Sequence, residues 1–266
     1  MPFNYEQSIW GAGEAELKWS SPTAFRLKQA LGALSGLSSG KVLEVGSGAG
    51  QFIRALKHLR PNLECHGCDI SAEAIKTAKT KNDGVIYELN SSVLPYQDNF
   101  FDAVLIFDVL EHVADYQGLL VEIKRILKPG GIFYCFVPCE GDWASLWYYL
   151  RHFIAFKDLT EKYAGHINHL SRGQWLKNFN KAGFTVEQKR YSEHFLGQLL
   201  GVVIFWFMAK KAGDGQMNNE KFFAELNQKQ SSFLTLIKKT VNSLIYLESV
   251  IFSRLPSPNL HVVLKK

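Results

Sequence analysis

A glycine-rich turn that follows an apolar strand constrains this chain more than any other feature. The run Val42–Val45 is largely apolar, and Gly46, Gly48 and Gly50 then alternate before an amphipathic helix over Gln51–Leu59. Glycine has no Cβ, so its backbone can pass close to a bound molecule in conformations that other residues avoid. The free N–H groups at a helix start also attract a carboxylate or a lone-pair-rich ligand. The pattern predicts a strand, a ligand-cradling turn and a helix.

The glycine spacing separates two classes of ligand. A dinucleotide fingerprint has glycine at its first, third and sixth positions, where it seats a pyrophosphate. Counted from Gly46, the sixth position is Gln51. An oxidoreductase with a nicotinamide cofactor would need glycine there, so the sequence disfavours that class.

Further motifs follow the turn in a fixed order. Asp69-Ile70-Ser71 closes a second strand, the segment Leu94–Val104 leads into a fourth, and Asp108–Val113 and Leu127–Gly131 come after it. Together with Glu44-x-Gly46-x-Gly48-x-Gly50, these segments resemble the class I S-adenosylmethionine-dependent methyltransferases. The Leu-Glu-His-Val and Leu-Lys-Pro-Gly-Gly pair resembles their type 11 subgroup, which includes quinone and small-molecule methyltransferases.

The resemblance implies S-adenosyl-L-methionine as the cofactor. It places Asp69 on the ribose hydroxyls, and a carboxylate at the end of a strand can accept both hydrogen bonds of a vicinal diol. The family commonly has Asp-Ala near the adenine, where this chain has Asn90-Ser91; an amide can still bond the adenine edge. The expected cofactor-binding residues are Glu44, Gly46, Gly48, Gly50, Asp69, Ile70, Asn90, Ser91 and Asp108.

Charge and cysteine content exclude several function classes. The net charge is +5 and the basic residues are spread along the chain, so nucleic acid is not expected as a partner. The mild positive excess would also suit an anionic membrane surface or an acidic substrate, although solvated lysines explain it equally. Four cysteines make no disulfide framework, which favours a reducing cytoplasm.

The pair Cys65-x-x-Cys68 invites a metal or redox interpretation. A strand points these two side chains to opposite faces, and no second Cys/His pair at zinc spacing follows, so no metal site is expected. No charged lead with an apolar core and cleavage site is visible at the N-terminus, so no signal peptide is expected either.

Alternating strand and helix patterns predict an α/β fold. The expected sheet is doubly wound, seven-stranded, mostly parallel and Rossmann-like, with an antiparallel last strand and helical insertions after strands five and six. The expected strands are Val42–Val45, Glu64–Asp69, Val85–Leu89, Ala103–Phe107, Ile132–Val137, Phe184–Tyr191 and Leu260–Leu264, separated by helical patterns up to the fifth. Ser71 is the expected cap of one helix, and Ser171 to Gln174 are the expected capping box of another.

We expect one domain over residues 1–266, because single α/β domains reach about 250 residues. Residues 1–40 form an N-terminal cap, residues 41–194 and 259–266 the core, and residues 195–258 a hydrophobic helical insertion. In the cap, Tyr5, Trp10 and Trp19 are candidates to cover the cofactor or simply to pack.

The insertion of about 65 residues joins the tops of strands six and seven, so it can cover the acceptor as a lid. Its apolar part, Phe195–Ala209, is shorter than the ~20 residues that span a bilayer. Its second part, 219–254, carries an apolar stripe along one helical face, and Glu248 falls inside that stripe. Glu248 is either a buried catalytic carboxylate or a carboxylate that reaches out to a lysine. The stripe comprises Leu226, Phe233, Leu234, Ile237, Val241, Leu244 and Ile251.

Hydrophobic packing, an acceptor pocket and a monotopic membrane surface all remain open for this insertion. The aromatic segment Trp143–Leu150 rises from the same face of the sheet, which favours an apolar acceptor.

Methyl transfer is an in-line displacement that requires alignment and exclusion of water. An oxygen acceptor also needs a base that titrates near neutrality. His112 is the first candidate and His166 the second; each can instead shape its loop. We expect methylation of a small, apolar or lipid-like acceptor, with oxygen favoured over carbon, in the cytoplasm or at its membrane. The alternative is a non-catalytic methyltransferase-like subunit that stabilises a partner through the insertion.

Overall fold

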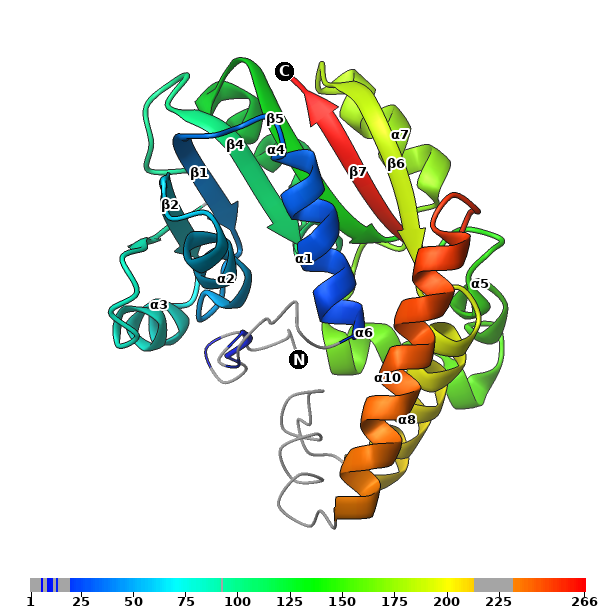
Figure 1. Ribbon diagram of the computed structural model, residues 1–266. Coiled ribbons are helices and arrows are strands. Elements are labelled where there is room, and N and C mark those ends of the chain that lie inside the picture. Colours follow the sequence, from blue (N-terminus) through cyan, green and yellow to red (C-terminus); the bar gives the residue numbers. More distant parts are fainter. Residues whose placement is uncertain (1–5, 7–8, 12, 14–19, 92, 213–231) are drawn as a thin grey trace.

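Seven strands form a single mixed sheet (Figure 1). The computed structural model describes residues 1–266 except 1–5, 7–8, 12, 14–19, 92 and 213–231, and leaves out the side chains of 211–212 and 232–235. The strands are β1 (Gly40–Val45), β2 (Leu63–Asp69), β3 (Ile86–Leu89), β4 (Phe101–Phe107), β5 (Leu127–Pro138), β6 (Thr185–Ser192) and β7 (Asn259–Lys265).

The strand order is β3-β2-β1-β4-β5-β7-β6. Strands β1 to β5 pair in parallel, and β7 runs antiparallel to both β5 and β6. The predicted Rossmann-like sheet with an antiparallel last strand is confirmed. The carboxyl ends of β1, β2, β4 and β5 therefore meet at one edge of the sheet, where α/β folds bind ligands.

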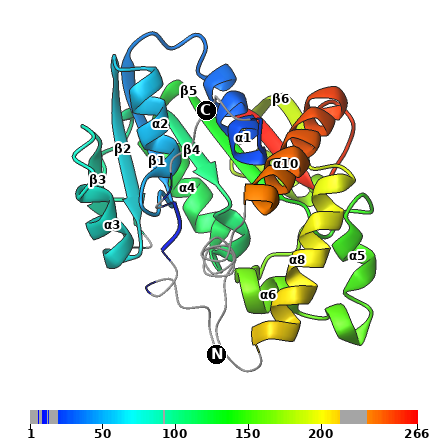
Figure 2. The ribbon, with the colours of Figure 1, turned by 60° about the horizontal axis from the view of Figure 1, so that its bottom comes forward.

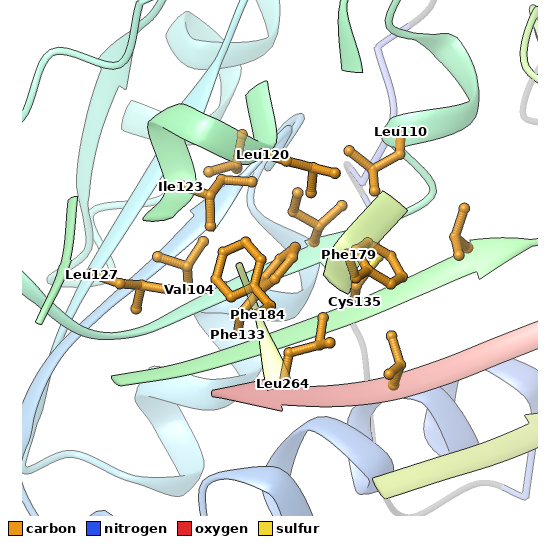
Figure 3. Packing of buried hydrophobic residues seen from close by; sticks show 14 of the residues in the cluster. Val104, Leu110, Leu120, Ile123, Leu127, Phe133, Cys135, Phe179, Phe184 and Leu264 are labelled. Carbon is orange, nitrogen blue, oxygen red and sulfur yellow. The ribbon is translucent and has the colours of Figure 1, made fainter. Parts of the chain in front are cut away.

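Helices cover both faces of this sheet. One face packs on α4 (Tyr116–Ile126) and α7 (Arg172–Lys181), and Figure 3 shows this core, to which Ile123, Phe133 and Phe179 belong. The other face packs on α1 (Pro22–Ala33), α2 (Gln51–Leu59) and α3 (Ala72–Lys79).

Neighbouring strand residues alternate between the two cores. Cys68 lies in the first core and Cys65 in the second, so the two thiols point to opposite faces, as the strand geometry predicts. Both are free thiols.

Local polar residues set the helix boundaries. Ser71 accepts a hydrogen bond from the Ala74 N–H at the start of α3, and Ser171 and Gln174 form a complete capping box on α7. Helix α7 ends before Gly183, whose φ of 82° suits glycine. Each cap was predicted from the sequence.

The crossover from β3 to β4 differs from the prediction, because residues 90–100 contain no helix in their described part. Arg125 of α4 holds this loop instead. Its guanidinium donates to the carbonyl oxygens of Leu94 and Tyr96 at 3.1 and 2.8 Å and pairs with Glu122 and Asp98. Glu122 in turn accepts the Leu94 N–H at 3.0 Å, so side chains replace helical hydrogen bonds.

Helical insertions follow strands five and six, as predicted. After β5 come α5 (Leu146–Leu150), the 3-10 turn η2 (Ile154–Phe156) and α6 (Leu159–Ala164); α8 (Leu196–Ala212) and α10 (Ser232–Phe252) lie between β6 and β7. Figure 2 shows α5, α6 and α8 side by side, and Tyr163, Phe205 and Met208 form a small core between them.

Among the helices that the structure describes, none is both long enough and apolar enough to cross a membrane. The division of the chain into cap, core and insertion stays a prediction.

Helix α10 packs through a face other than the predicted stripe. Ile245 and Ser249 are buried, whereas Ile237, Leu244 and Ile251 are 43%, 48% and 63% exposed. Contacts with α1 fix this rotation, because Tyr246 packs edge-on against Phe25. Leu226 and the side chains of Phe233 and Leu234 lie outside the described residues.

Glu248 contacts the start of α8. Its Oε1 accepts the N–H groups of Phe195 and Leu196 at 2.8 and 3.0 Å and so caps α8 from the neighbouring helix.

Candidate active site

A cavity of about 800 Å³ lies at the carboxyl ends of the parallel strands. Its lining includes Val45, Asp69, Phe107 and Pro138, which end β1, β2, β4 and β5. Helices α6 and α8 complete the wall away from the sheet, where Ala164, Gly197, Gln198, Gly201 and Phe205 line the cavity. The volume lies within the usual ~300–1,000 Å³ of small-molecule sites.

The glycine turn forms one wall of this cavity. Gly46, Gly48 and Gly50 all have left-handed φ angles, of 71°, 52° and 86°. A Cβ would come within 2.4 Å of the Val109 side chain at Gly46 and within 2.4 Å of the Trp10 carbonyl oxygen at Gly48. Glycine is therefore required here by both conformation and space.

The N-terminal segment closes over this turn. The Ala49 N–H donates to the Trp10 carbonyl oxygen at 2.7 Å, and Trp10 and Gly11 line the cavity. Upstream, the Glu6 carboxylate accepts the N–H groups of Ala72 and Glu73 at 3.0 and 3.2 Å and so caps α3. Tyr5 and Trp19 lie outside the described residues.

Asp69 ties the glycine turn to the end of β2. Its Oδ2 accepts the Gly48 N–H at 2.7 Å and its Oδ1 accepts the Ser71 N–H at 2.9 Å. Burial raises the pKa of Asp69, and the N–H groups of Ser71 and Gly48 oppose this shift. Each oxygen keeps a second lone pair, and the residue lines the cavity.

Ile70, Asn90 and Ser91 line the same end of the cavity. The Asn90 amide donates to the Ser91 carbonyl oxygen at 3.0 Å. Its Oδ1 is buried and has no hydrogen-bond partner among the described residues, which leaves it able to accept from a ligand amine.

Glu44 lines the cavity near the end of β1, just before the turn. Its Oε2 accepts the Ile53 N–H at 2.8 Å, and only 2% of the residue is exposed. Burial raises the pKa of Glu44 to about 8. Its hydrogen bond secures α2 against β1.

Asp108 lies directly after β4 with a φ of 51°. Arg26 of α1 donates to Asp108 at 2.6 Å and to Glu193 at 3.1 Å, and its guanidinium lies 4.1 Å from the ring centre of Phe136. All three charged residues line the cavity. Asp108 is thus held at the cavity wall by the guanidinium of Arg26.

The two predicted histidines come together in the wall opposite the glycine turn. His112 ends the 3-10 turn η1 (Leu110–His112), His166 follows α6, and their ring centres are 4.9 Å apart. The Nδ1–H of His112 donates to the Gly165 carbonyl oxygen at 3.0 Å, so the neutral ring carries its lone pair on Nε2. Burial lowers the pKa of His112 to about 4.

Glu140 binds His166 and His169 with its two oxygens, at 2.6 and 2.7 Å from their Nδ1 atoms. Burial alone would lower the pKa of His166, but the Glu140 carboxylate raises it to about 9. The two histidines also hold the pKa of Glu140 well below its usual range, against the effect of its burial.

Sequence reasoning missed Arg26, Glu140 and Glu193 as cavity residues. A usable signal existed for two of them, because Glu140 and Glu193 come shortly after the ends of β5 and β6. Asp69 and Asp108 hold similar positions, at the end of β2 and directly after β4. No comparable pattern marks Arg26 within α1.

The part of the chain that carries the glycine turn also matches a known family. Residues 43–135 match the family described as "Methyltransferase domain". A demethylmenaquinone methyltransferase of Tropheryma whipplei (strain Twist) is 34% identical over 100 residues, which are 36% of this chain and 41% of that protein. One from Staphylococcus aureus (strain JH9) is 38% identical over 101 residues, 36% of this chain and 42% of that protein.

The matches to these relatives cover less than half of the relatives' length, and the family match ends at residue 135, before both insertions. Among solved structures, phospholethanolamine N-methyltransferase 2 of Haemonchus contortus has a TM-score of 0.57 at 19% identity, over 98% of this chain and 55% of that chain. At that identity the likeness concerns the fold.

Proposed function

We propose that this protein, whose residues 43–135 belong to the class I S-adenosylmethionine-dependent methyltransferases of the type 11 group, transfers a methyl group to a small, lipid-like acceptor. The observation that carries the proposal is the continuous cavity of about 800 Å³, which joins the glycine turn to the wall with His112 and His166. A donor and an acceptor can therefore meet inside one cavity.

The cofactor half of the cavity is formed by the turn and by the ends of β2 and β3. We assign the ribose hydroxyls to Asp69, the adenine edge to Asn90 and Ser91, and an apolar contact to the exposed Ile70. The left-handed glycines let the turn approach the ligand closely, and Glu44 keeps α2 in place behind it. Asp108 completes this half beside Arg26.

When bound, S-adenosylmethionine supplies a methyl group on a sulfonium for an in-line displacement. The chain must then align the acceptor, exclude water and take up a proton. Trp147 and Phe205 provide the apolar contacts at the acceptor end, and their rings pack edge-on at 5.4 Å.

His112 is the proposed proton acceptor, through Nε2, because Nδ1 is engaged with the Gly165 carbonyl oxygen. Its pKa of about 4 lies below the near-neutral value expected for such a base, but it keeps the ring neutral and able to take up a proton at neutral pH. His166, paired with Glu140, lies beside it and stabilises the charge that develops on the acceptor oxygen.

Oxygen is the proposed position of methylation, because a hydroxyl acceptor must lose its proton and His112 can take that proton up. The names of the relatives support a quinone-type acceptor, and one from Desulfotalea psychrophila is a ubiquinone/menaquinone biosynthesis C-methyltransferase. That name favours carbon, the second candidate. A phenolate can react at its oxygen or at a ring carbon, so the same removal of the hydroxyl proton serves methylation at either atom.

An exposed apolar surface favours contact with a membrane. Phe195, directly before α8, and Leu199, Val203 and Phe207 within it recur every four residues and are all 40% or more exposed. Leu244, Leu247 and Ile251 add a second exposed apolar face on α10, which also carries Lys238 and Lys239. We propose that these helices rest on an anionic lipid surface and that the protein is a peripheral membrane enzyme of the cytoplasm.

Methyl transfer is tested with the full-length protein, radiolabelled S-adenosylmethionine and a panel of hydroxylated quinols and phenols. Transfer of label to an organic-soluble product, absent without acceptor, supports the proposal, and nuclear magnetic resonance of that product separates oxygen from carbon. Binding of the cofactor without transfer to any acceptor would favour the non-catalytic subunit.

The membrane contact has its own test, co-sedimentation with anionic vesicles. Replacing Leu199 and Phe207 by serine should abolish binding, whereas the same change at Leu59, 40% exposed on α2, should not. A wild-type protein that never sediments with anionic vesicles contradicts the contact.

A further inference from the structure

The carboxylate of Glu111 is buried without a hydrogen bond. The residue is 0% exposed, and neither of its oxygens has a hydrogen-bond partner among the described residues. His112 Nε2 lies 3.8 Å from its Oε1, beyond hydrogen-bond distance. An ionised carboxylate in such a place costs several kcal/mol unless a charge compensates it. His166 is the charged neighbour of this carboxylate, and a cation bound between the two side chains would take the place of the proton on His166.

Two imidazoles converge on this carboxylate. One ligand atom from each of Glu111, His112 and His166 lies within 4.8 Å of the other two. His112 uses Nδ1 on the Gly165 carbonyl oxygen, and His166 uses Nδ1 on Glu140 at 2.6 Å. Both rings are thus fixed through Nδ1, so Nε2 is the ring atom that can face an ion. An imidazole fixed through its other nitrogen by a carboxylate or carbonyl is the usual arrangement of metal-binding histidines.

The backbone around the cluster is fixed as well. The Glu111 carbonyl oxygen accepts the N–H groups of Ile167 and Asn168 at 2.9 and 3.0 Å. The Asn168 amide donates to the carbonyl oxygens of Leu110 and Val113 at 2.8 and 2.7 Å. These bonds join η1 to the loop after α6, so residues more than 50 positions apart in the sequence are held together as one unit.

We propose that Glu111, His112 and His166 bind one divalent first-row transition cation, with Zn²⁺ the preferred ion. Two imidazoles and one carboxylate suit such ions, whereas Mg²⁺ and Ca²⁺ prefer oxygen ligands. Ligand bonds of about 2.0–2.2 Å require the three side chains to close on the ion from their present spacing. His112 and His166 line the cavity, so the ion keeps an open position on that side.

Occupancy has a consequence for the proposed methyl transfer. A cation bonded to His112 Nε2 takes the lone pair that would otherwise accept a proton, so metal binding and proton uptake at this atom exclude one another. The existence of the site does not depend on methyl transfer, and its test needs no acceptor.

The test is titration of the metal-free full-length protein with Zn²⁺ against a chromophoric chelator, and with Co²⁺ followed by its visible absorption. We expect one ion per chain, with affinity at least about tenfold lower in Glu111→Gln and His166→Gln. Glu140→Gln should lose about 10- to 100-fold, since it orients His166. His169→Gln is the matched control, because His169 contacts the same Glu140 but is not a ligand.

Circular dichroism and thermal unfolding of each metal-free variant separate a lost site from a lost fold. Absence of stoichiometric binding would mean that Glu111 is a buried carboxylic acid that keeps its proton, and would overturn the proposal. Equal Zn²⁺ affinity in wild type and Glu111→Gln, or tighter binding of Mg²⁺ than of Zn²⁺, would overturn it too.

Discussion

Replacing Gly48 by alanine should weaken cofactor binding strongly, because two independent costs meet at this residue. Its φ is 52°, and an L side chain in the left-handed region costs roughly 1–2 kcal/mol. The added Cβ would also lie 2.4 Å from the Trp10 carbonyl oxygen. Relieving that contact moves Trp10 away from the Ala49 N–H, a hydrogen bond worth about 1 kcal/mol.

The sum is about 2–3 kcal/mol, which corresponds to about 30- to 150-fold in affinity if the bound state requires the present turn. Calorimetric titration with S-adenosylhomocysteine measures this loss directly. Gly32→Ala is the matched control, because a Cβ at that position of α1 meets no atom within 4 Å. Helix propensity makes that change neutral or stabilising. Unaltered affinity and unfolding temperature in Gly48→Ala would refute the steric reasoning.

Three further substitutions test other parts of the account. Asp69→Asn should lower S-adenosylhomocysteine affinity at least about tenfold in calorimetry, because an amide nitrogen cannot accept the Gly48 or Ser71 N–H; unchanged affinity would remove Asp69 from the ribose site. His112→Ala should abolish methyl transfer while S-adenosylhomocysteine still binds, and full turnover at every pH would place the base elsewhere. Glu122→Gln concerns stability: hydrogen bonds from Arg125 hold the pKa of Glu122 below its ordinary value of 4.5, so the contribution of Glu122 is present above pH 4.5 and is lost as the pH falls through the lowered value. Thermal unfolding in acid should therefore decline more steeply in wild type than in Glu122→Gln, and parallel curves would contradict this.

The sheet and the cofactor turn could be predicted because their signals are local. Parallel strands buried on both faces read as short apolar runs, and Gly46, Gly48 and Gly50 mark left-handed positions whatever surrounds them. Helix caps at Ser71 and Ser171 are equally local, since the capping side chain and its N–H partner are three residues apart. These features needed no knowledge of distant contacts.

Features that depend on tertiary contacts could not be predicted. The loop over residues 90–100 owes its shape to Arg125, which reaches it from α4. The packed face of α10 is selected by Phe25 of α1, and Glu248 finds its partners at the start of another helix. Nothing in the sequence near these residues specifies such pairings.

The histidine cluster lies between these cases. His112 and His166 were each recognised as candidates, but their meeting depends on Asn168 joining η1 to the loop after α6. A search for metal sites at zinc-finger spacing cannot find this set of ligands. Glu111 and His112 are adjacent in the sequence, and His166 is more than 50 residues away from them. A search for carboxylates just after the ends of the predicted strands would have identified Glu140 and Glu193.

The most direct test of the central claim is calorimetric titration of the purified protein with S-adenosylmethionine and S-adenosylhomocysteine, with NAD as the control. The account predicts that both sulfur ligands bind with micromolar affinity at one site per chain and that NAD does not bind. Binding of NAD alone, or of none of the three, would contradict the assignment of the glycine turn and of Asp69 to a methyltransferase cofactor.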